Sequence, residues 1–188
     1  MSTATAQGVR RWWDADGGWS TADAAGTVLV IDSWLVDEGR VRGLDRHAER
    51  FGSACDRFSE PGAEQTNRFL RAVAESLPAR GRWFPRVELV KIGSGTRLRM
   101  WLRPAPPRTA TVRVAGTAGH QVVTEQATAP DLAGVPVWTL NALHGIRPVT
   151  EGLGRFQDTD AAVAERWQSR LAALAVPAGA SLIPVVNP

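Results

Sequence analysis

The sequence of 188 residues has very little of several residue types that carry chemistry. Its one cysteine, Cys55, excludes a disulfide within the chain, and a reducing compartment, the cytoplasm, is the expected setting. No apolar run approaches the roughly 18 residues that a membrane-spanning helix needs, so we expect no membrane partner. The first eleven residues lack the basic and apolar stretches of a signal peptide. Tyrosine is absent and lysine occurs once, at Lys91, so any lysine-dependent chemistry must use that residue.

The charge pattern excludes other classes of protein. The formal net charge is only +3, although the pI is near 10.3, because few groups titrate between histidine and arginine. The arginines are spread along the chain among acidic residues, whereas a nucleic-acid-binding protein gathers them on one face. We therefore expect no nucleic-acid partner. The three histidines and Cys55 lack the spacing of metal ligands, so no metal site is predicted either.

The N-terminal half of the sequence predicts a sheet and two helices. Residues 27–36 are rich in β-branched side chains and predict a strand, followed by a turn at 37–39 and a second strand of a hairpin. Apolar residues at helical spacing predict helices over 44–58, capped by Asp45, and from Pro61 to Leu77. Three further strands are predicted in residues 84–115.

The remaining sequence predicts a smaller set of elements. Residues 116–119 form a small-residue joint, and short strands are expected in 120–126, 135–143 and 144–150. A last helix over 158–174 is expected to be capped by Asp158 or Thr159. Its apolar face contains Val163, Trp167, Leu171 and Leu174. The fold class is therefore α+β, with an N-terminal small lobe in 1–115 and a reduced C-terminal lobe in 116–188.

Two segments in this order resemble a known family. DSWLVDEGRVRGLDRHAERF, residues 32–51, is similar to the N-terminal signature of the class IV pyridoxal-phosphate aminotransferases, in which a helix opens with His-x-x-Arg. VWTLNALHGIRPVT, residues 137–150, is similar to the C-terminal signature, and its Asn-Ala-Leu resembles the aminodeoxychorismate lyase branch. The resemblance covers most of 27–115 and 120–175, and it implies the small lobe of that family, a sheet with two helices.

The resemblance also implies a cofactor and its ligands. The family holds pyridoxal phosphate as a Schiff base on a lysine, and it either transaminates amino acids or eliminates pyruvate from aminodeoxychorismate. Arg50 matches the arginine that binds the cofactor phosphate. Asn141, Ala142 and Leu143 match the turn that also meets the phosphate. The resemblance thus implies that these four residues bind the cofactor. The alternatives are that Arg50 is a solvent-facing helix arginine and that residues 141–143 form an ordinary turn between strands.

The sequence departs from the family in its middle section. The family carries the Schiff-base lysine and the glutamate that pairs with the pyridine nitrogen between the two signatures, and that section is absent here. Lys91 lies within a predicted strand of the small lobe, so no catalytic residue is assigned. His47 lies on the apolar spacing of a helix and is expected to be structural. The tryptophans are expected mostly in the core.

These observations favour two hypotheses. The first is a shortened aminotransferase or aminodeoxychorismate lyase whose pyridoxal-phosphate chemistry is impaired by loss of the lysine section. The alternative is a non-catalytic binding or interaction module that uses the residual cofactor cleft for a small anionic ligand or a partner chain. In both hypotheses a homodimer is expected, because family members commonly dimerise and a shortened lobe exposes apolar surface.

Overall fold

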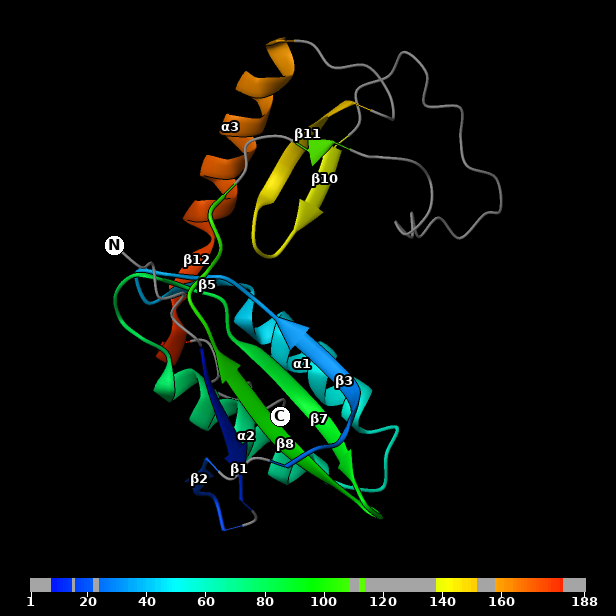
Figure 1. Ribbon diagram of the computed structural model, residues 1–188. Coiled ribbons are helices and arrows are strands. Elements are labelled where there is room, and N and C mark those ends of the chain that lie inside the picture. Colours follow the sequence, from blue (N-terminus) through cyan, green and yellow to red (C-terminus); the bar gives the residue numbers. More distant parts are fainter. Residues whose placement is uncertain are drawn as a thin grey trace, which may run out of the picture. The chain divides into compact units, whose positions relative to one another are not determined.

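The computed structural model describes residues 8–14, 16–21, 24–108, 112–113, 138–151 and 158–180. The chain divides into two compact units. The first contains the described residues up to Pro106 together with 174–180, and the second contains those from Pro107 to Ala173. Helices and mainly antiparallel strands make up both units, which confirms the α+β class (Figure 1). The lobes that the sequence predicts, 1–115 and 116–188, stay a prediction.

A five-stranded antiparallel sheet is the centre of the first unit. Its order is β2-β1-β8-β7-β3. The strands are β1 (Val9–Trp13), β2 (Trp19–Ser20), β3 (Thr27–Ser33), β7 (Arg86–Ile92) and β8 (Gly95–Leu102). The predicted strands over residues 27–36 and 84–104 are thus confirmed in outline. The sequence analysis predicted no element before residue 27, whereas the structure has β1 there as an inner strand.

Two helices, α1 (Leu44–Cys55) and α2 (Ala63–Ser76), cover one face of this sheet (Figure 1). Fully buried Phe51 and Phe69 from the helices pack with Leu89 and Met100 from the strands. Burial of such side chains stabilises the fold by about 1.5–3 kcal/mol each. The helices therefore form where the sequence places its apolar spacing.

The predicted starts of these helices are wrong by one or two residues. Gly43, not Asp45, is the N-cap of α1, and its φ of 58° suits glycine, which has no Cβ to clash. Asp45 lies in the first turn, where its charge still interacts favourably with the helix dipole. The second helix begins at Ala63 after an N-cap at Gly62, not at Pro61.

A small second sheet closes one end of the first unit. Its order is β12-β5-β4-β6, formed by β12 (Ala175–Pro177), β5 (Arg40–Arg42), β4 (Val36–Asp37) and β6 (Arg82–Trp83). Glu38 and Gly39 make the predicted hairpin turn with φ of 49° and 70°, which is the backbone of a tight two-residue turn. A 3₁₀ turn, η1 (Ala178–Ala180), follows β12.

The face of the large sheet opposite the helices carries arginine and tryptophan side chains. Trp12 is 2% exposed, and the guanidinium carbons of Arg97 and Arg99 lie 5.1 and 4.7 Å from its ring centre. Buried Glu88 accepts a hydrogen bond of 2.6 Å from Arg99 Nε. Stacked guanidinium groups cover apolar ring surface while their charges stay paired. This face is thus largely covered by its own side chains.

The second unit contains a hairpin and a helix. The hairpin is formed by β10 (Trp138–Asn141) and β11 (Gly145–Glu151), and β11 also pairs in parallel with β9 (Val112–Arg113). The helix is α3 (Asp158–Ala173). The predicted strand in 120–126 and the residues before Asp158, on which the capping prediction depends, lie outside the described residues.

Part of the predicted apolar face of α3 is wrong. Trp167 is 47% exposed, and Leu174, which follows the helix, is 68% exposed. The tryptophan prediction is confirmed for Trp34, which is 1% exposed, and is wrong for Trp167. No helix in the described part of the chain is long and apolar enough to cross a membrane.

We predict that the thiol of Cys55 is unreactive in the folded protein. Burial, with a smaller contribution from the neighbouring Asp56 charge, raises its pKa to about 12, so almost no thiolate exists at pH 8. An aromatic disulfide reagent at pH 8 should label the native protein very slowly and the denatured protein rapidly. As a control, a thiol at exposed Ser53 on the same helix (Ser53→Cys with Cys55→Ala) should react within minutes. Equally fast labelling of native Cys55 would contradict the prediction.

Candidate functional site

A buried carboxylate at the end of β3 is the starting point of the candidate site. A bulge between Val28 and Val30 sets the register so that Asp32 lies opposite Val87, on the face that the helices cover. Asp32 is 5% exposed. A buried carboxylate must be hydrogen-bonded or paired, because transfer of an isolated charge out of water is very costly.

The partners of Asp32 come from helix α1. Arg50 donates from Nε to Oδ2 at 3.0 Å and from Nη2 to both oxygens at 2.6 and 2.8 Å. Nδ1 of His47 lies 3.1 Å from Oδ1 and 2.9 Å from Nη2 of Arg50. His47 and Arg50 are three residues apart, which places both side chains on one face of the helix. The His-x-x-Arg spacing therefore serves to hold the carboxylate on the neighbouring strand.

This arrangement determines the protonation of Asp32. Burial alone would raise the pKa of the carboxyl, but the hydrogen bonds and charges of His47 and Arg50 lower it further than burial raises it. The net pKa lies below the ordinary value of 3.8. Asp32 is thus a permanent anion at neutral pH, and it fixes the orientation of the Arg50 guanidinium.

The cluster has one group that a ligand can reach and one buried donor. The Arg50 side chain is 65% exposed, and within the described part of the chain its Nη1 makes no hydrogen bond. Trp34, whose ring centre lies 5.4 Å from that of His47, is buried with its indole N–H lacking an acceptor among the described residues. An unsatisfied buried donor costs about 1–3 kcal/mol, and because Trp34 is only 1% exposed, a ligand at Arg50 does not reach this N–H.

The other predicted residues lie in the second unit. Asn141 ends β10, and Ala142 and Leu143 form the turn into β11. Oδ1 of Asn141 accepts a hydrogen bond of 2.7 Å from the backbone N–H of His144, and Gln168 of α3 donates to the carbonyl oxygens of His144 and Ile146. The turn is therefore held by side chains of its own unit.

The structure joins some of the predicted residues with partners that the sequence analysis missed. It brings Arg50 and His47 together with Asp32, the first residue of the segment that resembles the N-terminal signature. An acidic residue at a strand end, followed by His-x-x-Arg in the next helix, was the available signal. Arg50 and the 141–143 turn lie in different units, and their assignment as cofactor ligands stays a prediction.

Lys91 does not have the environment that would make it a nucleophile. Burial beside apolar residues would lower the pKa of a lysine amine and activate it, but the structure places Lys91 exposed, near the end of β7 that leads into the β7–β8 turn. It lies four residues beyond Val87, the register partner of Asp32, which is about 13 Å along the strand. Among the residues that the structure describes, no group of three or more His, Cys, Asp or Glu side chains is placed to hold a metal.

Comparison with known proteins identifies the fold by structure. No known protein family matches the sequence, and no curated protein is similar to it by sequence. The chain is similar to the crystal structure of a Corynebacterium glutamicum protein whose name, itself provisional, calls it an aminotransferase. The TM-score is 0.53 at 13% identity, with 88% of this chain and 99% of that chain covered. The chain therefore has an aminotransferase-like fold.

Weaker matches are to a provisionally named aminotransferase from Mycobacterium tuberculosis. Its pyridoxal-phosphate-bound form matches with a TM-score of 0.36, and its form with α-ketoglutarate and pyridoxamine phosphate with 0.37, both at 19% identity. These matches cover 52% and 51% of this chain. They span about 40% of the length of the Mycobacterium protein.

We predict that Asp32→Asn destabilises the protein in a pH-dependent way. At pH 7 the variant should lose about 1–3 kcal/mol of unfolding free energy, because it weakens charge-assisted hydrogen bonds to Arg50. The folded pKa of Asp32 is below 3.8, so the carboxylate contributes fully above that value and its contribution is lost as the pH falls through the folded pKa. The difference between wild type and variant should therefore shrink below about pH 4.

Urea denaturation between pH 3 and pH 8 measures this difference. Asp45→Asn is the matched control, since Asp45 is exposed in the first turn of the same helix. It should cost about 0.5 kcal/mol at neutral pH. If the difference in unfolding free energy between wild type and Asp32→Asn stayed constant over the whole pH range, the prediction would be wrong, because the charge of Asp32 would then contribute nothing to stability.

Proposed function

We propose that this chain is a shortened protein of the class IV aminotransferase and aminodeoxychorismate lyase type that retains a phosphate-binding subsite for pyridoxal phosphate at Arg50. The observation that carries this proposal is the fixed and exposed guanidinium of Arg50. Asp32 holds its Nε and Nη2 side, and the remaining donors face solvent. A pre-oriented arginine fork is well suited to a phosphate group.

The residues present fit the phosphate end of the cofactor and not its reactive end. Pyridoxal phosphate supplies an electron sink only when a lysine amine holds and serves its aldehyde carbon. The one lysine of the sequence is exposed and lies about 13 Å along β7 from the Asp32 register. We therefore propose that transamination and pyruvate elimination are lost or severely impaired, and that binding is what remains.

The alternative function is an interaction module that uses the same cluster for a different small anion or for a partner chain, with the chain as a homodimer. The two functions differ in ligand, because the first requires the pyridoxal ring and phosphate together.

A spectroscopic titration tests the proposal. Pyridoxal phosphate should give a saturable absorbance change, and pyridoxal without phosphate should bind at least about tenfold more weakly, because a charge-assisted phosphate contact is worth about 1.5–3 kcal/mol. Arg50→Gln should abolish saturation. Arg46→Gln is the control, since Arg46 lies on the same helix with a 78% exposed side chain paired only to Glu49.

Borohydride reduction followed by mass spectrometry separates the alternatives. Saturable binding without a covalent adduct supports a surviving phosphate subsite without chemistry. An adduct on Lys91, with transamination that Lys91→Ala abolishes, contradicts the loss of activity. Absence of any binding contradicts the cofactor subsite and leaves the interaction module as the better hypothesis.

A further inference from the structure

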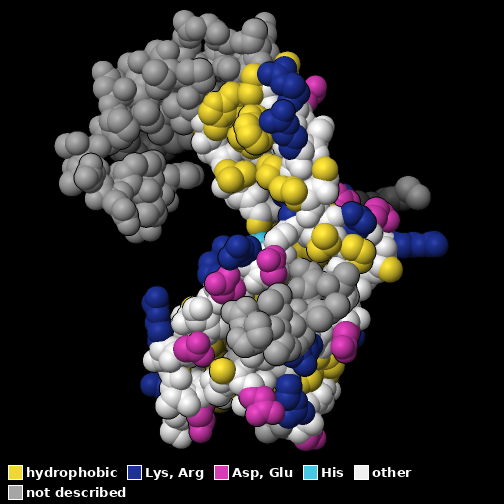
Figure 2. Space-filling view, turned by 180° about the vertical axis from the view of Figure 1, so that it is seen from behind, with side chains coloured by type: hydrophobic (Ala, Val, Ile, Leu, Met, Phe, Trp, Pro, Cys, Tyr) yellow, Lys and Arg dark blue, Asp and Glu magenta, His cyan; other side chains and the backbone are white. Residues whose placement is uncertain are grey.

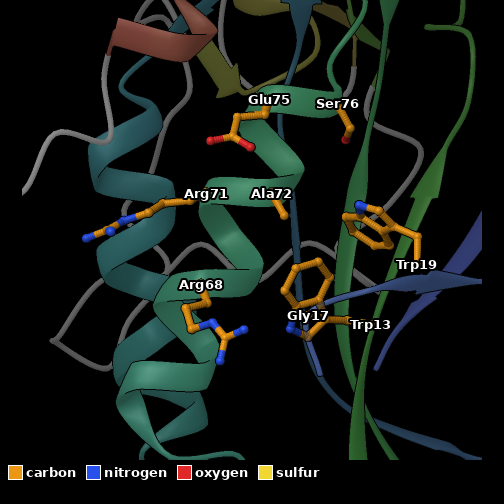
Figure 3. Close-up of a pocket in the computed structure, with 8 residues that line it drawn as sticks. All are labelled: Trp13, Gly17, Trp19, Arg68, Arg71, Ala72, Glu75 and Ser76. Atoms are coloured by element: carbon orange, nitrogen blue, oxygen red, sulfur yellow. The ribbon is translucent and has the colours of Figure 1, made fainter. Parts of the chain in front are cut away.

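A hollow of about 480 Å³ lies in the first unit, between helix α2 and the β1–β2 segment. It is formed by residues other than those of the Arg50 cluster. Figure 3 shows the side chains that surround it: Trp13, Gly17, Trp19, Arg68, Arg71, Ala72, Glu75 and Ser76. The volume is in the range of pockets that bind small organic molecules.

One side of the hollow is an aromatic wall. The rings of Trp13 and Trp19 meet edge to face, with centres 5.0 Å apart and an angle of 69°. Both lie against the buried ring of Phe69, at 6.1 and 5.9 Å. Because Phe69 belongs to the core, the indoles are held in place before any ligand arrives. Trp13 is only 6% exposed, and Ala72 of α2 packs against the same core, so the wall that a ligand can reach is partly exposed Trp19 with Ala72 (Figure 3).

The other chemical feature is an arginine without an internal partner. Arg68 makes no hydrogen bond or ion pair with any other residue that the structure describes, and Figure 3 shows its guanidinium directed toward Trp13. A Cβ added to Gly17 would lie 2.7 Å from Nη2 of Arg68, and Gly17 has a φ of 91°. A glycine at this position therefore gives Arg68 the space to lie against the β1–β2 turn.

The charge balance of the hollow is positive. Arg68 and Arg71 contribute two cations against the single carboxylate of Glu75. Neither arginine forms an ion pair within the described residues, so the helix has not neutralised them. An exposed cation beside fixed aromatic rings favours a ligand with an anionic end and a flat apolar body.

We infer that this hollow binds a small aromatic monocarboxylate, with the carboxylate on Arg68 and the ring against the partly exposed Trp19 and Ala72. The site is independent of Arg50, and it does not rest on the pyridoxal-phosphate proposal. Its ligand differs in class as well, since the Arg68 guanidinium beside one partly exposed indole suits a monoanion with a single flat ring system.

A titration with 2-naphthoate, followed by NMR of the indole N–H signals, tests the inference. Trp13→Phe and Trp19→Phe assign the two signals. Both should shift saturably with a dissociation constant on the order of 1 mM or tighter, as expected for a ligand of this size. The neutral 2-naphthalenemethanol should bind about tenfold more weakly, because it lacks the charge-assisted contact.

Matched variants locate the site. Arg68→Gln should weaken binding about tenfold or more. Arg71→Gln removes the same charge from the same helix, but Figure 3 shows that its guanidinium points away from the indoles, so the loss should stay below about threefold. Ala72→Leu fills the hollow without changing charge and should also weaken binding about tenfold. Thermal melts and NMR spectra verify that each variant is folded.

Several outcomes would overturn the inference. These are no saturable shift, equal binding of the neutral alcohol, wild-type affinity in Arg68→Gln or Ala72→Leu, and loss of binding in Arg50→Gln but not in Arg68→Gln. Concentration-dependent self-association that Arg68→Gln abolishes, with no naphthoate binding, would mean that a second copy of the chain uses the hollow instead, and it would overturn the inference as well.

Discussion

The buried carboxylate of Asp32 is the constraint around which the first unit is organised. The register of β3 puts this charge on the face that the helices cover, where it must be neutralised. Only a helix that crosses this strand with suitable donors satisfies it, and α1 does so with His47 and Arg50 three residues apart. The same contact that ties α1 to the sheet leaves one edge of the Arg50 guanidinium toward solvent. The ion pair of Arg50 with Asp32 is therefore compatible with the proposed phosphate subsite at the same arginine.

The two faces of the large sheet are covered from solvent in different ways. Helices α1 and α2 cover one face with an apolar core. The opposite face is covered by side chains of the sheet itself, because stacked guanidinium groups lie over Trp12 and Trp101. The arginines that make the sequence look basic are consequently used in stacking and pairing with Glu88 and Asp14. Figure 2 likewise shows basic and acidic side chains interspersed over the surface seen there.

The fold and the chemistry of the family separate in this chain. The aminotransferase-like fold depends on sheet register and core packing, which need no lysine. The family's catalysis depends on one amine at one position, and the exposed Lys91 on β7 is not placed to supply it. In the proposed function, the chain therefore keeps the fold and the phosphate subsite without the reactive amine. The hollow beside Trp13 and Trp19, which we infer to bind a monoanion, lies on α2, whereas the proposed phosphate subsite lies on α1.

The sequence by itself determined the α+β class, helices α1 and α2, the turn at Glu38-Gly39 and the lack of a second lysine, because these follow from local spacing, turn residues and composition. It also placed Arg50 in a recognisable signature. It did not predict the partnership of Arg50 with Asp32, the inner strand β1, or the exposure of Trp167. Those depend on which strands pair, in what register, and which helix face meets them. Contacts between residues distant in sequence are set by packing of the whole chain, so only the tertiary structure decided them.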